Sequence, residues 1–379
     1  MKLNWYGDNM RIGLLGGGQL GRMLLQEAID LNIHLHAMDN DPQAPCAAIM
    51  HSYTLGDITD FDAVMNFGKD KHILTVEIEN VNIEALELLE KQGVQVYPQP
   101  HVLKTIKDKG TQKEFYQKHE IPTAPFRLID NKAELSTVSF PIVQKLRTGG
   151  YDGKGVQVLK SISDVDKAFD APSVLEEMIP FTKELSVIVA RNANGEMRTF
   201  PVVECEFNPE ANLVEFLFSP ANISPSIEQK AETLAKSVIE KLDMVGLLAV
   251  ELFLTENDEL LVNEIAPRPH NSGHHTIECC LTSQFAQHLR SILNLPLGST
   301  ELTRAGAMIN LLGEKGFEGK AIYDGLETAL AMEGVYPHIY GKETTKPFRK
   351  MGHITITGKD VDEVKEKAKR VQSIVKVKA

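Results

Sequence analysis

The sequence predicts an α/β protein that begins with a doubly wound parallel sheet. Short apolar runs alternate with helical patterns between residues 11 and 97, and a glycine-rich turn joins the first run to the first helix. Strands that alternate with helices in this way form parallel sheets. The composition, with 42% hydrophobic and 24% charged residues, is that of a globular protein. A chain of 379 residues has room for two or three domains, at roughly 100–200 residues each.

The elements of the first region follow one another in a regular order. Four apolar runs have the length of buried strands, at residues 11–15, 33–38, 72–77 and 94–97. Helical periodicity is found at residues 22–31, after the first strand, and at residues 83–91, before the fourth strand. Each helix can cross over between neighbouring parallel strands, as a doubly wound sheet requires.

Three further regions follow the first, at residues 105–180, 181–301 and 302–379. The earliest of them contains a proline-rich turn and a second glycine-rich segment, residues 148–155. The last predicts a small mixed lobe with a charged helix at residues 360–372. We find no internal repeat and no low-complexity tract in the sequence.

Charge and cysteine content exclude several classes of partner. The chain carries 52 acidic and 40 basic residues, a net charge of −12, which argues against nucleic acid because phosphate contacts need a basic face. No apolar run approaches the ~18 residues of a membrane span, so no membrane partner is expected. The four cysteines include no C-x-x-C pair, and reduced thiols in a cytoplasmic protein are the simplest interpretation.

The first glycine turn fits the pattern G-x-G-x-x-G at Gly16, Gly18 and Gly21, and Asp39 ends the next strand. One interpretation is a dinucleotide site of an NAD-dependent enzyme, with Asp39 at the ribose. A second is a turn that only allows a strand and a helix to pack closely. A third is a site for another phosphate, since backbone N–H groups at a helix N-terminus favour anions.

The second glycine-rich segment follows an apolar strand and is flanked by Lys145, Arg147 and Lys154. Its glycines and cations are typical of a mobile loop that folds over a polyphosphate and excludes water. It is not a Walker A loop, because G-x-x-x-x-G-K-[ST] is absent. The alternative is a solvated hairpin tip. Lys145 ends the preceding strand, where it could reach α- and β-phosphates.

Two glutamates face each other in a predicted hairpin of residues 250–254 and 260–265. A simple hairpin places Glu251 opposite Glu264, with Phe253 and Val262 on the same side. Like charges in opposite positions destabilise a sheet, and a divalent cation turns that repulsion into coordination. The alternative is a pair of solvent-exposed glutamates at a sheet edge. The apolar setting and the polar segment that follows favour a magnesium site.

Two other segments allow more than one interpretation. His274 and His275 could bind metal, but histidines in a polar loop more often bind substrate or water. Residues 175–179 form a strand whose backbone could bond to an adenine edge, or an ordinary half-buried strand. No Ser/His/Asp or Cys/His arrangement indicates a covalent nucleophile.

Three segments together resemble the ATP-grasp superfamily, and within it the N5-carboxyaminoimidazole ribonucleotide synthetases, over nearly the whole chain. They are residues 17–23 (GGQLGRM), 147–155 (RTGGYDGKG) and 263–274 (NEIAPRPHNSGH). The resemblance implies an ATP-grasp fold with an N-terminal Rossmann-like domain and a small C-terminal lobe. It also implies four divisions. Residues 1–104 would form a first domain that shares the substrate site, and residues 105–180 a small subdomain with the phosphate-covering loop. Residues 181–301 would form a large subdomain with the Mg²⁺ site, and residues 302–379 the lobe.

The resemblance also implies roles for individual residues. ATP would be bound by Lys109, Lys145, Tyr151, Asp152, Gly153, Lys154, Gly155, Glu176, Glu177, Met178, Ile179, Glu184, Asn263 and Glu264. Mg²⁺ would be held by Glu251 and Glu264. The ribonucleotide would be bound by Gln19, Leu20, Glu77, Asp152, Arg268, His270, Asn271, Ser272, Lys342 and Arg349. The catalytic residues would be Tyr151, Asp152, Lys154, Arg268 and Asn271.

The implied reaction uses ATP, bicarbonate and 5-aminoimidazole ribonucleotide, with a homodimer as the implied assembly. Bicarbonate would attack the γ-phosphate to give carboxyphosphate. That intermediate, or CO₂ released from it, would then carboxylate the exocyclic amine. The nearest alternative is the formate-dependent glycinamide ribonucleotide transformylase. That enzyme has a serine-rich covering loop, and it has Asp-Thr where this chain has Asn271-Ser272. An NAD-dependent dehydrogenase and a non-catalytic nucleotide sensor are the alternatives from other classes.

Overall fold

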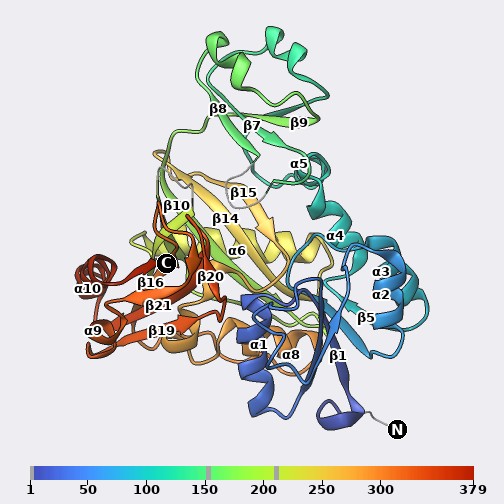
Figure 1. Cartoon of the computed structure of the whole chain (residues 1–379). Coiled ribbons are helices and arrows are strands. Elements are labelled where there is room, and N and C mark those ends of the chain that lie inside the picture. Colours follow the sequence, from blue (N-terminus) through green and yellow to red (C-terminus); the bar gives the residue numbers. More distant parts are fainter. Residues whose placement is uncertain (1–3, 151–154, 209–212) are drawn as a thin grey trace.

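The computed structural model describes residues 4–150, 155–208 and 213–379. The chain forms an N-terminal domain at the lower right, a small lobe at the top, and a sheet-based body that reaches the C-terminal end at the left (Figure 1). None of the helices among these residues combines the length and the apolar character needed to span a membrane.

The N-terminal domain confirms the predicted parallel sheet. Its strands lie in the order β3-β2-β1-β4-β5, and every pair is parallel. The strands are β1 (Arg11–Leu15), β2 (His34–Asp39), β3 (Ser52–Leu55), β4 (Ile73–Val76) and β5 (Gln95–Tyr97). The helices are η1 (Gly7–Asn9), α1 (Gln19–Asp30), α2 (Phe61–Gly68), α3 (Ile83–Lys91) and α4 (Pro100–Lys107). Helix α3 has the predicted bounds, whereas α1 begins inside the glycine turn rather than at Arg22.

The small lobe is an antiparallel sheet preceded by a helix. The strand order is β6-β9-β7-β8, and the side chains between this sheet and two short helices form a separate apolar cluster. The elements are α5 (Lys109–Lys118), β6 (Phe126–Ile129), η2 (Lys132–Thr137), β7 (Ile142–Leu146), β8 (Val156–Leu159), η3 (Ile162–Lys167) and β9 (Ser173–Glu177). The glycine-rich segment connects β7 and β8, and these two strands are paired with each other.

One large antiparallel sheet runs through the rest of the chain, in the order β15-β14-β10-β12-β13-β16-β21-β19, with β11 paired to β10. Its strands are β10 (Phe181–Arg191), β11 (Met197–Thr199), β12 (Val203–Asn208), β13 (Leu213–Ser219), β14 (Gly246–Thr255), β15 (Leu260–Ala266), β16 (Ala305–Leu312), β19 (Val335–Ile339) and β21 (Lys350–Gly358). Because β13 pairs with β16, the sheet continues across residue 301, where the sequence suggests a division.

Helices cover this sheet, and two small two-stranded sheets lie outside it. The helices are α6 (Pro225–Lys241), η4 (Asn271–Gly273), α7 (Thr276–Cys279), α8 (Gln284–Ile292), α9 (Leu326–Leu330) and α10 (Val361–Ile374). The small pairs are β17 (Gly319–Lys320) with β20 (Thr344–Thr345), and β18 (Ile322–Asp324) with β22 (Lys376–Lys378). Helix α10 is the charged helix that the sequence predicts, and its Asp360 side chain caps it by accepting from Glu363 N.

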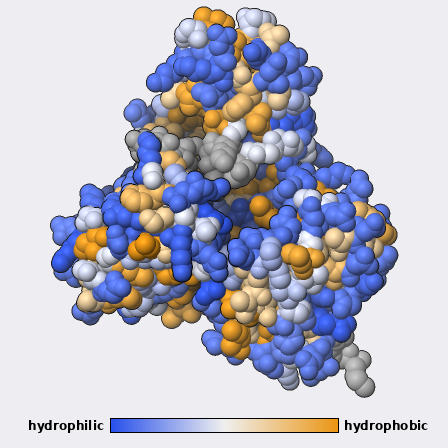
Figure 2. Space-filling model, in the orientation of Figure 1, coloured by the Kyte–Doolittle hydropathy of each residue, from blue (hydrophilic) through white to orange (hydrophobic). Residues whose placement is uncertain are grey.

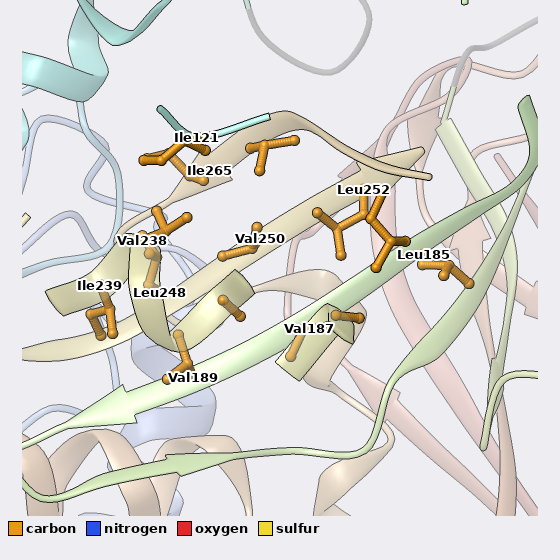
Figure 3. Close-up of a cluster of buried hydrophobic side chains, with 14 of the residues drawn as sticks. Ile121, Leu185, Val187, Val189, Val238, Ile239, Leu248, Val250, Leu252 and Ile265 are labelled. Carbon is orange, nitrogen blue, oxygen red and sulfur yellow. The ribbon is translucent and has the colours of Figure 1, made fainter. Parts of the chain in front are cut away.

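The main core lies between α6 and the strands β10 and β14. Figure 3 shows alternate residues of the two strands meeting the helix: Leu185, Val187 and Val189 from β10, Leu248, Val250 and Leu252 from β14, and Val238 and Ile239 from α6. Alternate side chains of a strand point to opposite faces. Glu251 lies between two core residues, so this packing directs its carboxylate to the opposite face of the sheet.

We expect Leu248→Ala to destabilise the protein by about 2–5 kcal/mol, because Leu248 is fully buried against α6 and truncation leaves a cavity. The matched control is Leu330→Ala in α9, where the side chain is 59% exposed and the change should stay within about 0.5 kcal/mol. Urea unfolding followed by circular dichroism measures both free energies. Equal losses in the two variants would contradict the assignment of this core.

Candidate active site

The candidate site lies on the hairpin of β14 and β15. Glu251 pairs directly with Glu264, which confirms the register that the sequence predicts. The register then shifts by one residue, so Phe253 faces Leu261 rather than Val262. The expectation that Phe253 and Val262 share a face is therefore wrong, since Val262 is buried in the core beneath the hairpin.

The shift leaves Asn263 as an extra residue in β15, and this bulge turns two consecutive side chains toward the same lobe. Lys145 Nζ donates to Asn263 Oδ1 at 2.7 Å, and Lys109 forms an ion pair with Glu264. Neighbouring side chains in a regular strand point to opposite faces, whereas a bulge re-aims them. An amide and a carboxylate are thereby presented together to two lysines of the small lobe.

The carboxylates of this hairpin form a strongly coupled group. Burial raises the pKa of Glu251 to about 7, and the negative charges of Glu264 and Glu184 act in the same direction. Burial also raises the pKa of Glu184, on β10, to about 7. Burial opposes ionisation of Glu264 too, but the charge and hydrogen bond of Lys109, together with the charges of Lys145 and Arg268, lower the pKa of that carboxyl. Cations are therefore what keep this cluster ionised.

A buried ion-pair network holds Lys145 in place. Glu176 on β9 forms ion pairs with Lys113 Nζ and Lys145 Nζ at 2.8 Å each, so its carboxylate lies between the two lysines. Glu176 and Lys113 are 3% and 2% exposed, so each charge depends on the other. Our sequence reasoning missed Lys113. Its place on the buried face of α5, one turn before Tyr116, is the periodic signal that identifies it.

The segment expected to bind adenine follows β9 directly and joins the small lobe to β10. Met178 is 49% exposed, Glu177 is exposed and Ile179 is half-buried, so this segment presents accessible side chains beside the hairpin. Phe181 at the start of β10 stacks on Phe253 with ring centroids 4.5 Å apart. These stacked rings and the exposed Met178 side chain offer an apolar surface suited to a flat heteroaromatic ring.

Both ends of the expected phosphate-covering loop are anchored. Arg147 donates to both oxygens of Asp108, at 2.9 and 2.8 Å, and Asp108 also caps α5. Gly155 resumes the chain at a φ of +79°, a conformation that favours glycine. The loop residues of the prediction, Tyr151, Asp152, Gly153 and Lys154, lie outside the described residues.

The first glycine turn is occupied by the protein's own carboxylates. Glu77, at the end of β4, accepts from Leu20 N at 2.9 Å and from Gly18 N, and Asp39 accepts from Gly17 N at 2.7 Å. The backbone donors that a dinucleotide pyrophosphate or another ligand phosphate would need are therefore already used. Close packing is also required here, because a Cβ atom on Gly18 would lie 2.4 Å from Glu77 Oε1.

The polar segment after β15 makes contacts with three other parts of the chain. Arg268 lies 2.9 Å from Glu79 Oε1 of the N-terminal domain. Asn271 and Asn310, on β16, exchange two amide hydrogen bonds at 2.9 and 3.1 Å. His270 Nε2 lies 3.7 Å from Glu251 Oε1, which connects this segment to the carboxylate cluster. Sequence reasoning missed Asn310, because its partner is distant in the chain.

The remaining predicted residues divide between buried supports and accessible cations. Ser272 is buried and shares a hydrogen bond with Ser186 at 2.8 Å. Lys342 donates to Lys350 O at 2.8 Å, and Arg349 donates to Thr344 O at 2.8 Å. Both cations are in the segment that joins β19 to β21. Figure 2 shows a recess where the three parts of the molecule meet, with hydrophilic surface around it.

The alternative that His274 and His275 bind a metal receives no support. His274 packs against His353 with ring centroids 4.6 Å apart and the rings tilted by 31°, and burial lowers the pKa of His275 to about 4. The metal-compatible group of three side chains among the described residues lies elsewhere, at Asp8, His34 and His51. His274 and His275 are therefore core residues beneath the site.

Three stretches of the chain match known protein families. Residues 9–107 match the ribonucleotide synthetase preATP-grasp domain, residues 114–285 the ATP-grasp domain, and residues 306–367 the phosphoribosylaminoimidazole carboxylase C-terminal domain. The ATP-grasp fold expected from the sequence is therefore confirmed.

Whole-chain relatives agree with these matches. The N5-carboxyaminoimidazole ribonucleotide synthase of Synechococcus elongatus is 39% identical over 355 residues, covering 91% of this chain and 89% of the relative. The crystal structure of the synthetase from Thermotoga maritima superposes with a TM-score of 0.91 at 42% identity, covering 98% of this chain and 99% of that one. The Aspergillus clavatus enzyme, solved with ADP and 5-aminoimidazole ribonucleotide, has a TM-score of 0.89 at 34% identity, with the same coverage. The chain therefore belongs to the N5-carboxyaminoimidazole ribonucleotide synthase (PurK) family of ATP-grasp ligases.

Proposed function

We propose that the chain carboxylates 5-aminoimidazole ribonucleotide at the expense of ATP, with bicarbonate as the carbon source. The observation that carries this proposal is the pairing of Glu251 with Glu264 next to Lys109 and Lys145. Two carboxylates and two ammonium groups are the donor set for a metal-bound polyphosphate. A relative whose structure holds ADP and 5-aminoimidazole ribonucleotide supports this substrate over glycinamide ribonucleotide and formate.

The donor set fits Mg²⁺. Oxygen ligands suit this ion, which takes one or two carboxylates together with substrate phosphates and water. Glu251 and Glu264 would hold the ion, and its charge would offset the burial and the repulsion from Glu264 that raise the pKa of Glu251. When bound, Mg²⁺ neutralises charge on the phosphate oxygens of ATP.

The lysines and the adenine segment would bind the nucleotide. Lys109 would exchange Glu264 for a phosphate oxygen, while Lys145, held by Glu176, would stay in position beside the phosphates. Residues 176–179 and Glu184 would contact adenine and ribose. Residues 151–155 would cover the phosphates and exclude water from the reactive intermediate.

The reaction has two steps, a phosphoryl transfer to bicarbonate and a carboxylation of the ribonucleotide amine. A bicarbonate oxygen attacks the γ-phosphorus and the bond from phosphorus to the β–γ bridging oxygen breaks. ADP is the leaving group, and carboxyphosphate is formed. The amine nitrogen of the ribonucleotide then bonds to the carboxyl carbon, inorganic phosphate leaves, and the nitrogen loses a proton. Arg268 and Asn271, fixed by Glu79 and Asn310, would orient the reactants for the second step.

Several further properties belong to the same proposal. The same proposal keeps the division into four regions at residues 104, 180 and 301, and family matches that end at 107 and begin at 306 lie near the first and third boundaries. A cytoplasmic location, which belongs to this proposal, would keep the four free cysteines reduced. A homodimer is the assembly that we expect, and sedimentation would measure it.

The substrate assignment predicts that ADP release depends on the ribonucleotide. We expect a rate on the order of 1–10³ s⁻¹ with ATP, Mg²⁺, bicarbonate and 5-aminoimidazole ribonucleotide, and a much lower rate when the ribonucleotide is omitted. ¹³C-labelled bicarbonate should appear as a carbamate carbon in the product by NMR. ADP release driven instead by formate and glycinamide ribonucleotide would reverse the choice between the two ligases.

The metal assignment predicts that Glu264→Gln lowers kcat by about 10²-fold or more, because the neutral amide is a poor Mg²⁺ ligand. The matched control is Glu256→Gln, an exposed position in the turn of the same hairpin, which should keep full turnover. ADP release over a range of Mg²⁺ concentrations, with melting curves for both variants, measures this. Near-normal turnover in a folded Glu264→Gln variant would remove the metal site from the hairpin.

A further inference from the structure

Arg22 lies in the first turn of α1, where a cation is electrostatically unfavourable. The N-terminal end of a helix carries partial positive charge, and acidic side chains are usually found there. The first turn of α1 has no acidic residue, and Arg22 is part of it. An anion bound next to Arg22 would offset this unfavourable interaction.

The described residues of the chain do not supply that anion. Arg22 forms no ion pair with a carboxylate among them, and the one hydrogen bond of its side chain, from Nη1 to Pro45 O, is long at 3.4 Å. The nearby carboxylate of Glu77 is turned to the amides of Gly18 and Leu20. The guanidinium is half-buried, so its donors remain accessible to a ligand.

The side chain of Arg22 reaches the segment that carries the two C-terminal cations. A Cβ atom on Gly341, which has a φ of +82°, would lie only 3.3 Å from Arg22 Nη1. An apolar cluster independently fixes this contact, because Tyr340 packs against Leu20, Met23 and other residues of α1. Arg22 and Lys342 therefore come from opposite ends of the chain to one place.

We propose that Arg22 binds the phosphate of the ribonucleotide together with Lys342 and Arg349. This inference rests on the proposed function. Because the amides of the glycine turn are used by Glu77 and Asp39, the N-terminal domain can contribute to phosphate binding here only through a side chain. A guanidinium offers forked donors that match two phosphate oxygens. The N-terminal and C-terminal regions then select together for a phosphorylated substrate.

The test compares Arg22→Gln with the wild type on two substrates, 5-aminoimidazole ribonucleotide and the same nucleoside without phosphate. The KM for the ribonucleotide should rise about 10- to 100-fold, since a charged hydrogen-bond pair is lost. The KM for the nucleoside, the KM for ATP and the kcat at saturating ribonucleotide should not change. The KM of Arg22→Lys for the ribonucleotide should lie between those of the wild type and Arg22→Gln, because lysine keeps the charge but loses the forked pair of donors.

Arg198→Gln is the matched control, an exposed arginine on β11 whose removal should leave every constant unchanged. Equal losses with nucleotide and nucleoside, or an unchanged KM for the ribonucleotide, would overturn the inference. If Arg22→Gln does not fold, Arg22→Lys gives the same comparison. A wild-type protein without ribonucleotide-dependent ADP release would instead contradict the proposed function.

Discussion

The repulsion between Glu251 and Glu264, held in opposite positions on β14 and β15, governs the organisation of this protein. Backbone pairing holds the two carboxylates opposite each other, and burial together with the negative charge of Glu264 raises the pKa of Glu251. The pair is stable only next to positive charge. Lys109 provides that charge by pairing with Glu264, so the cluster is already arranged to accept a cation.

Each part of the fold contributes to that cluster in a different way. Alternate packing of β10 and β14 on α6 directs Glu251 away from the core, and the bulge at Asn263 turns β15 toward the small lobe. The small lobe brings its lysines on α5 and β7, anchored by the buried carboxylate of Glu176. The N-terminal domain and β16 hold Arg268 and Asn271 from either side. The site therefore forms only when all of these parts of the chain are folded and packed together.

Local patterns of the sequence were sufficient for the parallel sheet, the bounds of α3 and the facing glutamates, because periodicity and hairpin arithmetic are local properties. The bulge was not predictable, since it depends on Asn263 meeting a lysine 118 residues away. The glycine turn was open to three interpretations for the same reason. Its ligand, Glu77, follows it by 59 residues, and only the folded sheet brings the two together.

The most direct test of the central claim is a crystal structure with Mn²⁺ and ADP, in which anomalous scattering locates the metal. The account predicts one peak within about 2.0–2.3 Å of oxygens from both Glu251 and Glu264, with Lys109 turned from Glu264 to a phosphate. A metal bound elsewhere, with Lys109 still paired to Glu264 and the two carboxylates apart, would contradict it.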